Sequence, residues 1–154
     1  MEARRCGTDH LTPLLLTSQG IYLADCTTKS LNYCYSELSN DEGLLLLCEA
    51  QIGDPLLLFD SDEGAADLVK KKGKHSTFGK GLTRFKDSAW VDAGERLQRE
   101  ELKGVRMPLG NPEKLQEEGE DYDLIYNERI LYKEDQLRFR YVRLRRYRRI
   151  LLLE

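Results

Sequence analysis

Histidine and paired cysteines are scarce in this sequence, which limits the chemistry it can support. Its 154 residues include two histidines, His10 and His75, and four cysteines with no Cys-x-x-Cys spacing. A zinc site would need distant ligands to converge, so we expect no metal. The cysteines are Cys6, Cys26, Cys34 and Cys48. They lie in segments typical of buried structure, and we expect free thiols in a reducing compartment, the nucleus or the cytoplasm.

Long apolar runs, internal repeats and low-complexity segments are also lacking. No stretch reaches the roughly 18 apolar residues that a membrane span requires, so we expect no membrane contact. The apolar run at residues 14–16 is too short for the core of a signal peptide. With 40% hydrophobic and 33% charged residues, the chain should form one globular and rather polar domain.

Charge is unevenly distributed, although the net charge is only −3. Residues 113–123 are strongly acidic, whereas residues 138–149 contain seven arginines and no acid. One interpretation of the basic run is contact with nucleic acid or with another polyanion. The other is that it forms the solvated face of a final strand.

Short apolar runs bounded by glycine or proline predict an α+β fold, with a mostly antiparallel sheet and few helices. The expected strands cover residues 21–24, 44–52, 56–59, 105–109, 124–132 and 137–144. The run 44–52 should be buried on both faces at its start, and Pro108 should mark a strand end or a sheet edge. The last strand should pair with the strand at 124–132 and carry a bulge at residues 141–142.

One helix is expected to carry chemically useful side chains. It should cover residues 26–35, with Asp25 as its N-cap. Spacings of three and four residues place Lys29, Ser30 and Tyr33 on one face of that helix. Such a face could hold a flat ring that bears an amide. Short surface helices are expected near residues 61–69 and 95–103.

Glu128 is the most unusual residue of the strand expected at 124–132. Alternation along that strand places its carboxylate on the same face as Tyr126 and Ile130. A carboxylate with apolar neighbours on either side lies in a cleft or is misplaced.

Four blocks of this sequence, in order, resemble the catalytic domain of the poly(ADP-ribose) polymerases. Residues 20–34, which read GIYLADCTTKSLNYC, are similar to the nicotinamide-site segment of that family. The similarity continues through residues 73–76, 104–110 and 124–128 and extends over roughly residues 19–145. We therefore expect an irregular segment at residues 1–19, followed at 20–154 by a partial, N-terminally incomplete domain with an ADP-ribosyltransferase-like fold.

The resemblance implies a mono- or poly-ADP-ribosyltransferase that uses NAD+ as its substrate. Such an enzyme splits the nicotinamide–ribose bond and passes ADP-ribose to a protein side chain or to a growing ADP-ribose chain. Glu128 matches the family's catalytic glutamate, which hydrogen-bonds ribose hydroxyls and helps to activate the acceptor.

The resemblance also assigns the residues that would bind NAD+. Tyr33 would stack on the nicotinamide and Ser30 would hydrogen-bond its carboxamide. Tyr22 would wall the pocket as the tyrosine of the family's His-Tyr-Glu triad. Lys29 would lie near Glu128.

One part of the family pattern has no match in this sequence. The family's His-Gly-Ser segment grips the ribose and amide of NAD+ and lies upstream of the residues that match here. Neither His10 nor His75 stands in an adequate context for it. The chain is then either a fragment or shortened product of a complete transferase, or a degenerate member that no longer turns over NAD+.

A binding function without catalysis is the rival hypothesis. In that case the arginine-rich terminus would hold nucleic acid or ADP-ribose polymer, and other domains could add contacts to nucleic acid. The presence of Tyr22, Ser30, Tyr33 and Glu128 together favours the transferase.

Overall fold

The computed structural model describes residues 20–34, 42–115 and 121–146. The sequence interpretation of residues 1–19 lies outside these ranges. The strands are β1 (Ile21–Leu23), β2 (Glu42–Ala50), β3 (Pro55–Leu58), β4 (Ser76–Gly79), β5 (Thr83–Arg84), β6 (Trp90–Asp92), β7 (Arg106–Pro108), β8 (Glu113–Lys114), β9 (Glu128–Leu131) and β10 (Leu137–Arg146). The helices are α1 (Thr27–Leu31), α2 (Ala65–Lys71) and α3 (Ala93–Leu97), with 3-10 turns η2 (Asp87–Ala89), η3 (Glu100–Leu102) and η4 (Glu134–Gln136).

A four-stranded sheet forms the centre of the molecule, in the order β1-β9-β4-β3. Strand β9 runs antiparallel to both β1 and β4, and β3 runs parallel to β4. Ile130 of β9 lies opposite Tyr22 on one side and Thr77 on the other. Ile130 and Leu131 are fully buried, so the core is built around β9.

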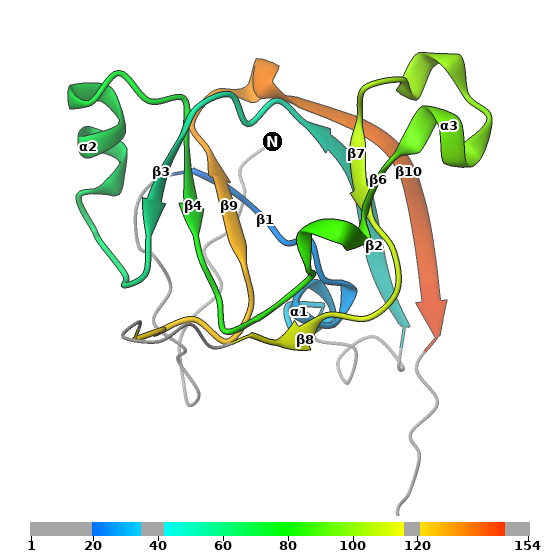
Figure 1. The fold of residues 1–154 in the computed structure, drawn as a ribbon, viewed down its shortest axis with the longest axis horizontal. Helices are drawn as coiled ribbons and strands as arrows, with labels where there is room; N and C mark the ends of the chain where they lie inside the picture. The colour runs from blue at the N-terminus through cyan, green and yellow to red at the C-terminus, as the bar shows by residue number, and fades with distance from the viewer. Residues whose placement is uncertain (1–19, 35–41, 116–120, 147–154) are drawn as a thin grey trace, which may run out of the picture.

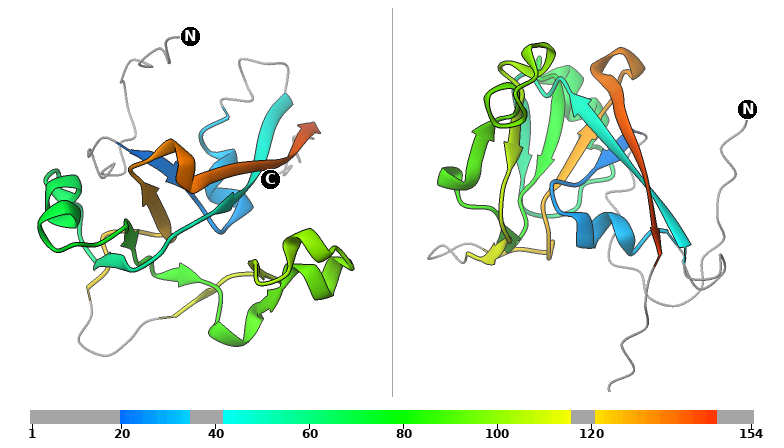
Figure 2. Two further views of the ribbon diagram at one scale, coloured as in Figure 1. Left: turned by 90° about the horizontal axis from the view of Figure 1, so that it is seen from above. Right: turned by 90° about the vertical axis from the view of Figure 1, so that its right-hand side faces the viewer.

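A long two-stranded ribbon, β2 with β10, forms a separate layer beside the central sheet (Figures 1 and 2). Its pairing runs from Leu137 opposite Ala50 to Arg146 opposite Glu42. Helix α1 lies at one end of the space between the ribbon and the sheet (Figure 2). Strands β5 and β8 form a second ribbon and β6 and β7 a third.

The fold class expected from the sequence is confirmed. The described residues form few helices and mostly antiparallel strands, as the series of short apolar runs predicted. Each expected strand is present with shifted bounds, and Pro108 is the last residue of β7. The expected surface helices appear as α2 and as α3 followed by η3.

The predicted pairing of the last strand with the strand at 124–132 is wrong. The turn η4 leads β10 away from the sheet, and β10 pairs with β2 instead. Gln136 fixes this change of direction, because its side chain accepts from the Tyr132 backbone N–H (3.3 Å) and donates to the carbonyls of Gln51 and His75 (3.1 Å each). The register of the ribbon shifts between Phe139 and Tyr141, just before the bulge position expected at 141–142.

Strand β9 begins at Glu128, four residues later than the sequence predicted. The preceding residues pair with a different segment: Leu82 N–H donates to the Leu124 carbonyl (2.9 Å), and Thr83 N–H donates to the Ile125 carbonyl (2.7 Å). The chain therefore leaves these partners before Asn127 and joins the central sheet at Glu128.

Helix α1 is shorter than predicted and is not capped by Asp25. It has five residues, its N-cap is Cys26, and no side chain caps it. Threonines at its first two positions and Asn32 at its C-cap are weak helix formers, which accounts for its length. Asp25 instead accepts a hydrogen bond from Asn127.

Strand β2 is not buried on both faces. Leu44, Leu46 and Leu47 are 62%, 56% and 60% exposed, because β10 is the only strand paired with β2 in the described ranges. Across those same ranges, no helix is both long enough and apolar enough to cross a membrane.

Candidate functional site

A buried ion pair joins Glu128 to Lys29 across 99 residues of sequence. Glu128 is the first residue of β9 and lies opposite Gly79 of β4. Lys29 projects from α1, and its ammonium contacts Glu128 Oε1. The lysine and glutamate side chains are 12% and 6% exposed. The expected proximity of Lys29 to Glu128 is therefore present in the structure.

The second carboxylate oxygen of Glu128 has a different environment. Oε2 is buried, and it finds no hydrogen-bond partner among residues 20–34, 42–115 and 121–146. Burying a charged oxygen without a partner is costly, and such atoms occur where a catalytic or ligand contact compensates for them. Glu128 is thus held through one oxygen and offers the other as an acceptor.

Tyr22 lies on the same face of the central sheet as Glu128. It is opposite Ile130 in the β1–β9 pair, and Ile130 and Glu128 are two residues apart on one strand, so their side chains share a face. Tyr22 is half-buried and packs against the cluster of Leu124 and Ile130. Of the neighbours predicted on this face, Ile130 is present, whereas Tyr126 precedes β9 and forms an isolated bridge with Thr83.

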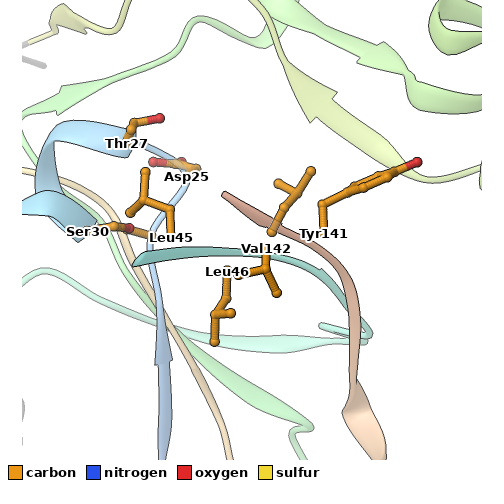
Figure 3. Close-up of a pocket in the computed structure, with 9 residues that line it drawn as sticks. Asp25, Thr27, Ser30, Leu45, Leu46, Tyr141 and Val142 are labelled. Carbon is orange, nitrogen blue, oxygen red and sulfur yellow. The ribbon is translucent and has the colours of Figure 1, made fainter. Parts of the chain in front are cut away.

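Ser30 lines a groove between α1 and the β2–β10 ribbon. The groove has a volume of about 530 Å³ and is also lined by Asp25, Thr27, Leu45 and Tyr141. In Figure 3, Leu45 lies on the α1 side of the groove, near Ser30, and Leu46 and Val142 line the groove from the ribbon. Polar groups from α1 therefore face apolar groups from the ribbon.

The proposed nicotinamide residues do not all line this groove. Tyr33 follows the end of α1 in a turn, where its backbone N–H donates to the Ser30 carbonyl (3.2 Å), and its side chain is 47% exposed. Neither Tyr33 nor Lys29 nor Glu128 is among the lining residues. The resemblance implies that Ser30, Tyr33 and Glu128 act on the same bound NAD+, and this stays a prediction.

A polar network beside Glu128 was missed by the sequence reasoning. Asn127 Nδ2 donates to Asp25 Oδ2 (2.7 Å), and Asn127 Oδ1 accepts from the Gly81 N–H (3.0 Å). Asn127 is 5% exposed. The sequence offered only a weak signal, an amide that directly precedes the candidate glutamate.

Arg129 of β9 interacts electrostatically with Asp25, a member of this network. Its guanidinium carbon lies 3.4 Å from the centroid of the Phe78 ring, a cation–π contact. Burial lowers the pKa of the Arg129 guanidinium, and the negative charge of Asp25 opposes that shift.

The described part of the chain contains no group of three or more His, Cys, Asp or Glu side chains that could hold a metal ion. Cys26, Cys34 and Cys48 are free thiols, and Cys26 is buried. Burial raises the pKa of the Cys48 thiol.

Known proteins match most of this chain. A family model described as the poly(ADP-ribose) polymerase catalytic domain matches residues 13–144. Similar relatives include "Poly [ADP-ribose] polymerase 2" from Zea mays (38% identical), Arabidopsis thaliana (41%) and Homo sapiens (36%), each over 80% of this chain.

The match covers only a part of each relative. It corresponds to 17% of the Zea mays protein, 18% of the Arabidopsis protein and 20% of the human protein. Within the matched residues lie both Lys29 and Glu128, the two side chains of the buried ion pair. The chain belongs to the family of the poly(ADP-ribose) polymerase catalytic domain, of which it carries a fragment.

Proposed function

We propose that this chain supplies the catalytic carboxylate of an NAD+-dependent ADP-ribosyltransferase. The observation that carries the proposal is the environment of Glu128, with Oε1 held by Lys29 and Oε2 buried without a partner in the described ranges. Family membership gives the reaction class. The acceptor would be a protein side chain or the end of an ADP-ribose chain.

The reaction breaks the bond between the nicotinamide nitrogen and C1′ of the ribose, and the bonding electrons leave with nicotinamide. Positive charge then develops on the ribose until an acceptor nucleophile bonds to C1′ and loses its proton. An anionic carboxylate near the sugar, in a site of low dielectric, stabilises that charge more in the transition state than in the ground state. Glu128 would supply this charge.

Lys29 would orient the carboxylate in this scheme. Because the lysine engages only Oε1, Oε2 stays available to accept a hydrogen bond from a ribose hydroxyl or from the acceptor. The ion pair would also offset part of the cost of burying the Glu128 carboxylate.

The nicotinamide ring would bind at residues 20–34, the segment that resembles the family's nicotinamide site. Tyr33 would stack on the ring, an interaction worth about 0.5–1.5 kcal/mol, and Ser30 would hydrogen-bond the carboxamide. Tyr22 would form a wall of this site from the Glu128 face of the sheet. The places of Tyr22 on β1 and Ser30 on α1 support this role, since β1 pairs with β9 and α1 contacts β9 through Lys29. Tyr33 lies in the turn that follows α1.

We propose that this chain alone is a weak transferase or glycohydrolase at best. Its sequence offers no adequate match to the family's His-Gly-Ser segment, so fewer groups would fix the ribose and the advantage of orientation is partly lost. A complete protein would act in the nucleus or the cytoplasm, where free thiols persist.

The test follows both ends of NAD+ separately. Purified chain is incubated with NAD+ labelled in the nicotinamide and, in a parallel sample, in the adenine. Release of nicotinamide reports bond cleavage, and adenine label that stays on protein reports transfer. The expected result is slow release by the wild-type chain and none above background by Glu128→Gln.

A matched control separates the site from a general effect of lost charge. Glu134→Gln makes the same substitution at an exposed position in η4 and should release nicotinamide at the wild-type rate. Equal release by Glu128→Gln and Glu134→Gln would contradict the proposal.

A further inference from the structure

Asn127 connects three separate parts of the chain through one buried side chain. Its Oδ1 accepts from Gly81 N–H (3.0 Å), in the loop that follows β4. Its Nδ2 donates to Asp25 Oδ2 (2.7 Å), in the turn between β1 and α1. Asn127 itself directly precedes β9. A carboxamide has both a donor and an acceptor, so one asparagine can make both bonds at once.

Only glycine fits at position 81, where the backbone N–H donates the bond to Asn127. A Cβ atom at position 81 would lie 2.2 Å from the Tyr126 carbonyl carbon and 2.6 Å from the Asn127 nitrogen. The backbone of Gly81 therefore lies directly against the backbone of residues 126 and 127, at a distance that only glycine permits. This contact places the Gly81 N–H against the asparagine side chain.

Asn127 also marks the point where the backbone changes its hydrogen-bonding partners. Residues 124 and 125 bond to residues 82 and 83, whereas Glu128 is already opposite Gly79 in the central sheet. Asn127 holds the chain at this change of direction. The position of the first β9 residue, Glu128, depends on it.

The asparagine also relates Glu128 to its lysine partner. Asp25 lies four residues before Lys29, so the bond from Asn127 to Asp25 ties the start of α1 to the start of β9. Lys29 and Glu128 then meet from these two anchored elements.

We infer that Asn127 is a positioning residue for Glu128: its two hydrogen bonds, to Gly81 and Asp25, set the carboxylate of Glu128 against the ammonium of Lys29. This inference rests on the proposed function for its catalytic meaning. Its structural content can be measured without any turnover.

Three variants divide the network into its parts. Asn127→Ala removes both bonds. Asn127→Asp keeps an acceptor for Gly81 N–H but cannot donate to Asp25 and faces it with a like charge. The double variant Asp25→Asn with Asn127→Asp exchanges the amide and the carboxylate, so both bonds and the net charge are restored.

The readouts are two nuclear magnetic resonance signals of the full chain labelled with nitrogen-15. Amide exchange at Gly81 reports its bond to residue 127. The ammonium signal of Lys29, visible while the ammonium is held by Glu128, reports the placement of the ion pair. Nicotinamide release is measured on the same samples, and Asn111→Asp, at an exposed position, is the matched control.

The expected results differ between the variants. In Asn127→Ala, Gly81 should exchange about tenfold faster or more, because its amide loses a buried partner, and the Lys29 signal should be lost. In Asn127→Asp, Gly81 should keep part of its protection while the Lys29 signal is lost. The double variant should regain the signal and return release to within about twofold of wild type, and Asn111→Asp should change neither.

A Lys29 signal that persists in folded Asn127→Asp would overturn the inference, as would its absence from the double variant. Rapid exchange of Gly81 in the wild-type chain would overturn it as well. If Asn127→Ala does not fold, Asn127→Asp and the double variant give the decision. A wild-type chain that releases no nicotinamide would count against the proposed function alone, because the two resonance signals would still decide the positioning.

Discussion

Single residues decide the chemistry of this site, and Lys29 with Glu128 is the clearest case. Both side chains are largely buried, so each one compensates for the cost of burying the other. Such a pair contributes little net stability compared with an apolar pair, but the loss of one partner leaves a buried charge. Its presence is therefore explained better by the placement of a carboxylate than by stability.

Removal of the lysine charge should destabilise the protein more than removal of an exposed lysine. For Lys29→Met we expect the free energy of unfolding to fall by about 3 kcal/mol, the lower end of the range for broken buried pairs. Urea unfolding measures this change. Lys103→Met is the matched control, because the Lys103–Glu100 pair is 70% and 89% exposed and should contribute less than about 1 kcal/mol.

The double variant Lys29→Met with Glu128→Gln tests whether the stability is lost because the buried Glu128 charge has no partner. It should recover a large part of the lost stability, because no buried charge is left without a partner. If Lys29→Met proves as stable as wild type, the ion pair is not buried in the way described.

The pairing of Lys29 with Glu128 could be predicted at the residue scale, whereas Asn127 could not. Lys29 and Glu128 stand in blocks whose order resembles a known family, and a carboxylate among apolar residues is conspicuous. A single asparagine before it fits a strand, a turn or a loop equally well. Its partners, Gly81 and Asp25, are distant in sequence and are fixed only by the fold.

At the scale of elements, α3 shows how one side chain organises a short helix. Asp92 is its N-cap and accepts from the backbone N–H groups of Glu95 (2.9 Å) and Gly104 (2.6 Å). The bond from Glu95 and, to a smaller extent, the bond from Gly104 hold the pKa of the Asp92 carboxyl below its usual range. The carboxylate ties α3 to the strand β7 that follows.

The pKa shift of Asp92 gives a prediction with a defined sign. Since the folded pKa is below the unfolded one, the carboxylate stabilises the fold above the ordinary Asp pKa of about 3.9 and loses this effect as pH falls through the folded pKa. Asp92→Asn should therefore be less stable than wild type at pH 7, with a difference that shrinks in acid. Thermal unfolding at several pH values measures it, and a constant difference would contradict the assigned cause.

The close approach at Gly81 gives a second prediction for elements. In Gly81→Ala the new methyl would overlap the backbone of residue 126, and we expect a loss of about 1–3 kcal/mol, the usual cost of overpacking. Gly64→Ala is the control, since its methyl would meet only the partly exposed Asp62 side chain, at 3.2 Å. Chemical unfolding compares them, and equal stability would show that the backbone contact is looser than described.

Strand positions were predictable, but strand partners were not. Apolar runs bounded by glycine or proline marked β2 and β3 within a few residues, and alternating polar and apolar residues marked β10. The sequence favoured a hairpin between β9 and β10 because they are neighbours in the chain. The side chain of Gln136 instead bonds to residues 51 and 75, and contacts of such long range leave no periodic signal.

At the scale of the whole molecule, the matched part of this chain corresponds to 17% of the Zea mays relative and 20% of the human relative. The β2–β10 ribbon exposes apolar residues, among them Phe139 (64%) and Val142 (65%). The apolar run of β2 was predicted to be buried on both faces, and this prediction is wrong because the ribbon is largely exposed. A run rich in leucine predicts burial, yet burial also depends on which elements lie beside the strand.

The rival binding function makes a distinct prediction for the whole chain. If the arginine-rich run at 138–149 binds polyanions, affinity for ADP-ribose polymer or nucleic acid should fall steeply with salt. Such binding should survive Glu128→Gln, because it needs the arginines and not the carboxylate. Filter binding at several salt concentrations measures this. Salt-sensitive binding without any nicotinamide release would favour the rival over the transferase.

The central claim, that Glu128 acts on the transition state, is tested most directly by measuring NAD+ affinity and nicotinamide release together for wild type and Glu128→Gln. The glutamine keeps the size of the side chain but removes its charge, so release should fall by about 10²–10³, the usual cost of one lost electrostatic contact. Affinity should change much less, because stacking on Tyr33 and a hydrogen bond to Ser30 need no charge at position 128. Robust nicotinamide release by Glu128→Gln would contradict the account and would make Glu128 a structural residue.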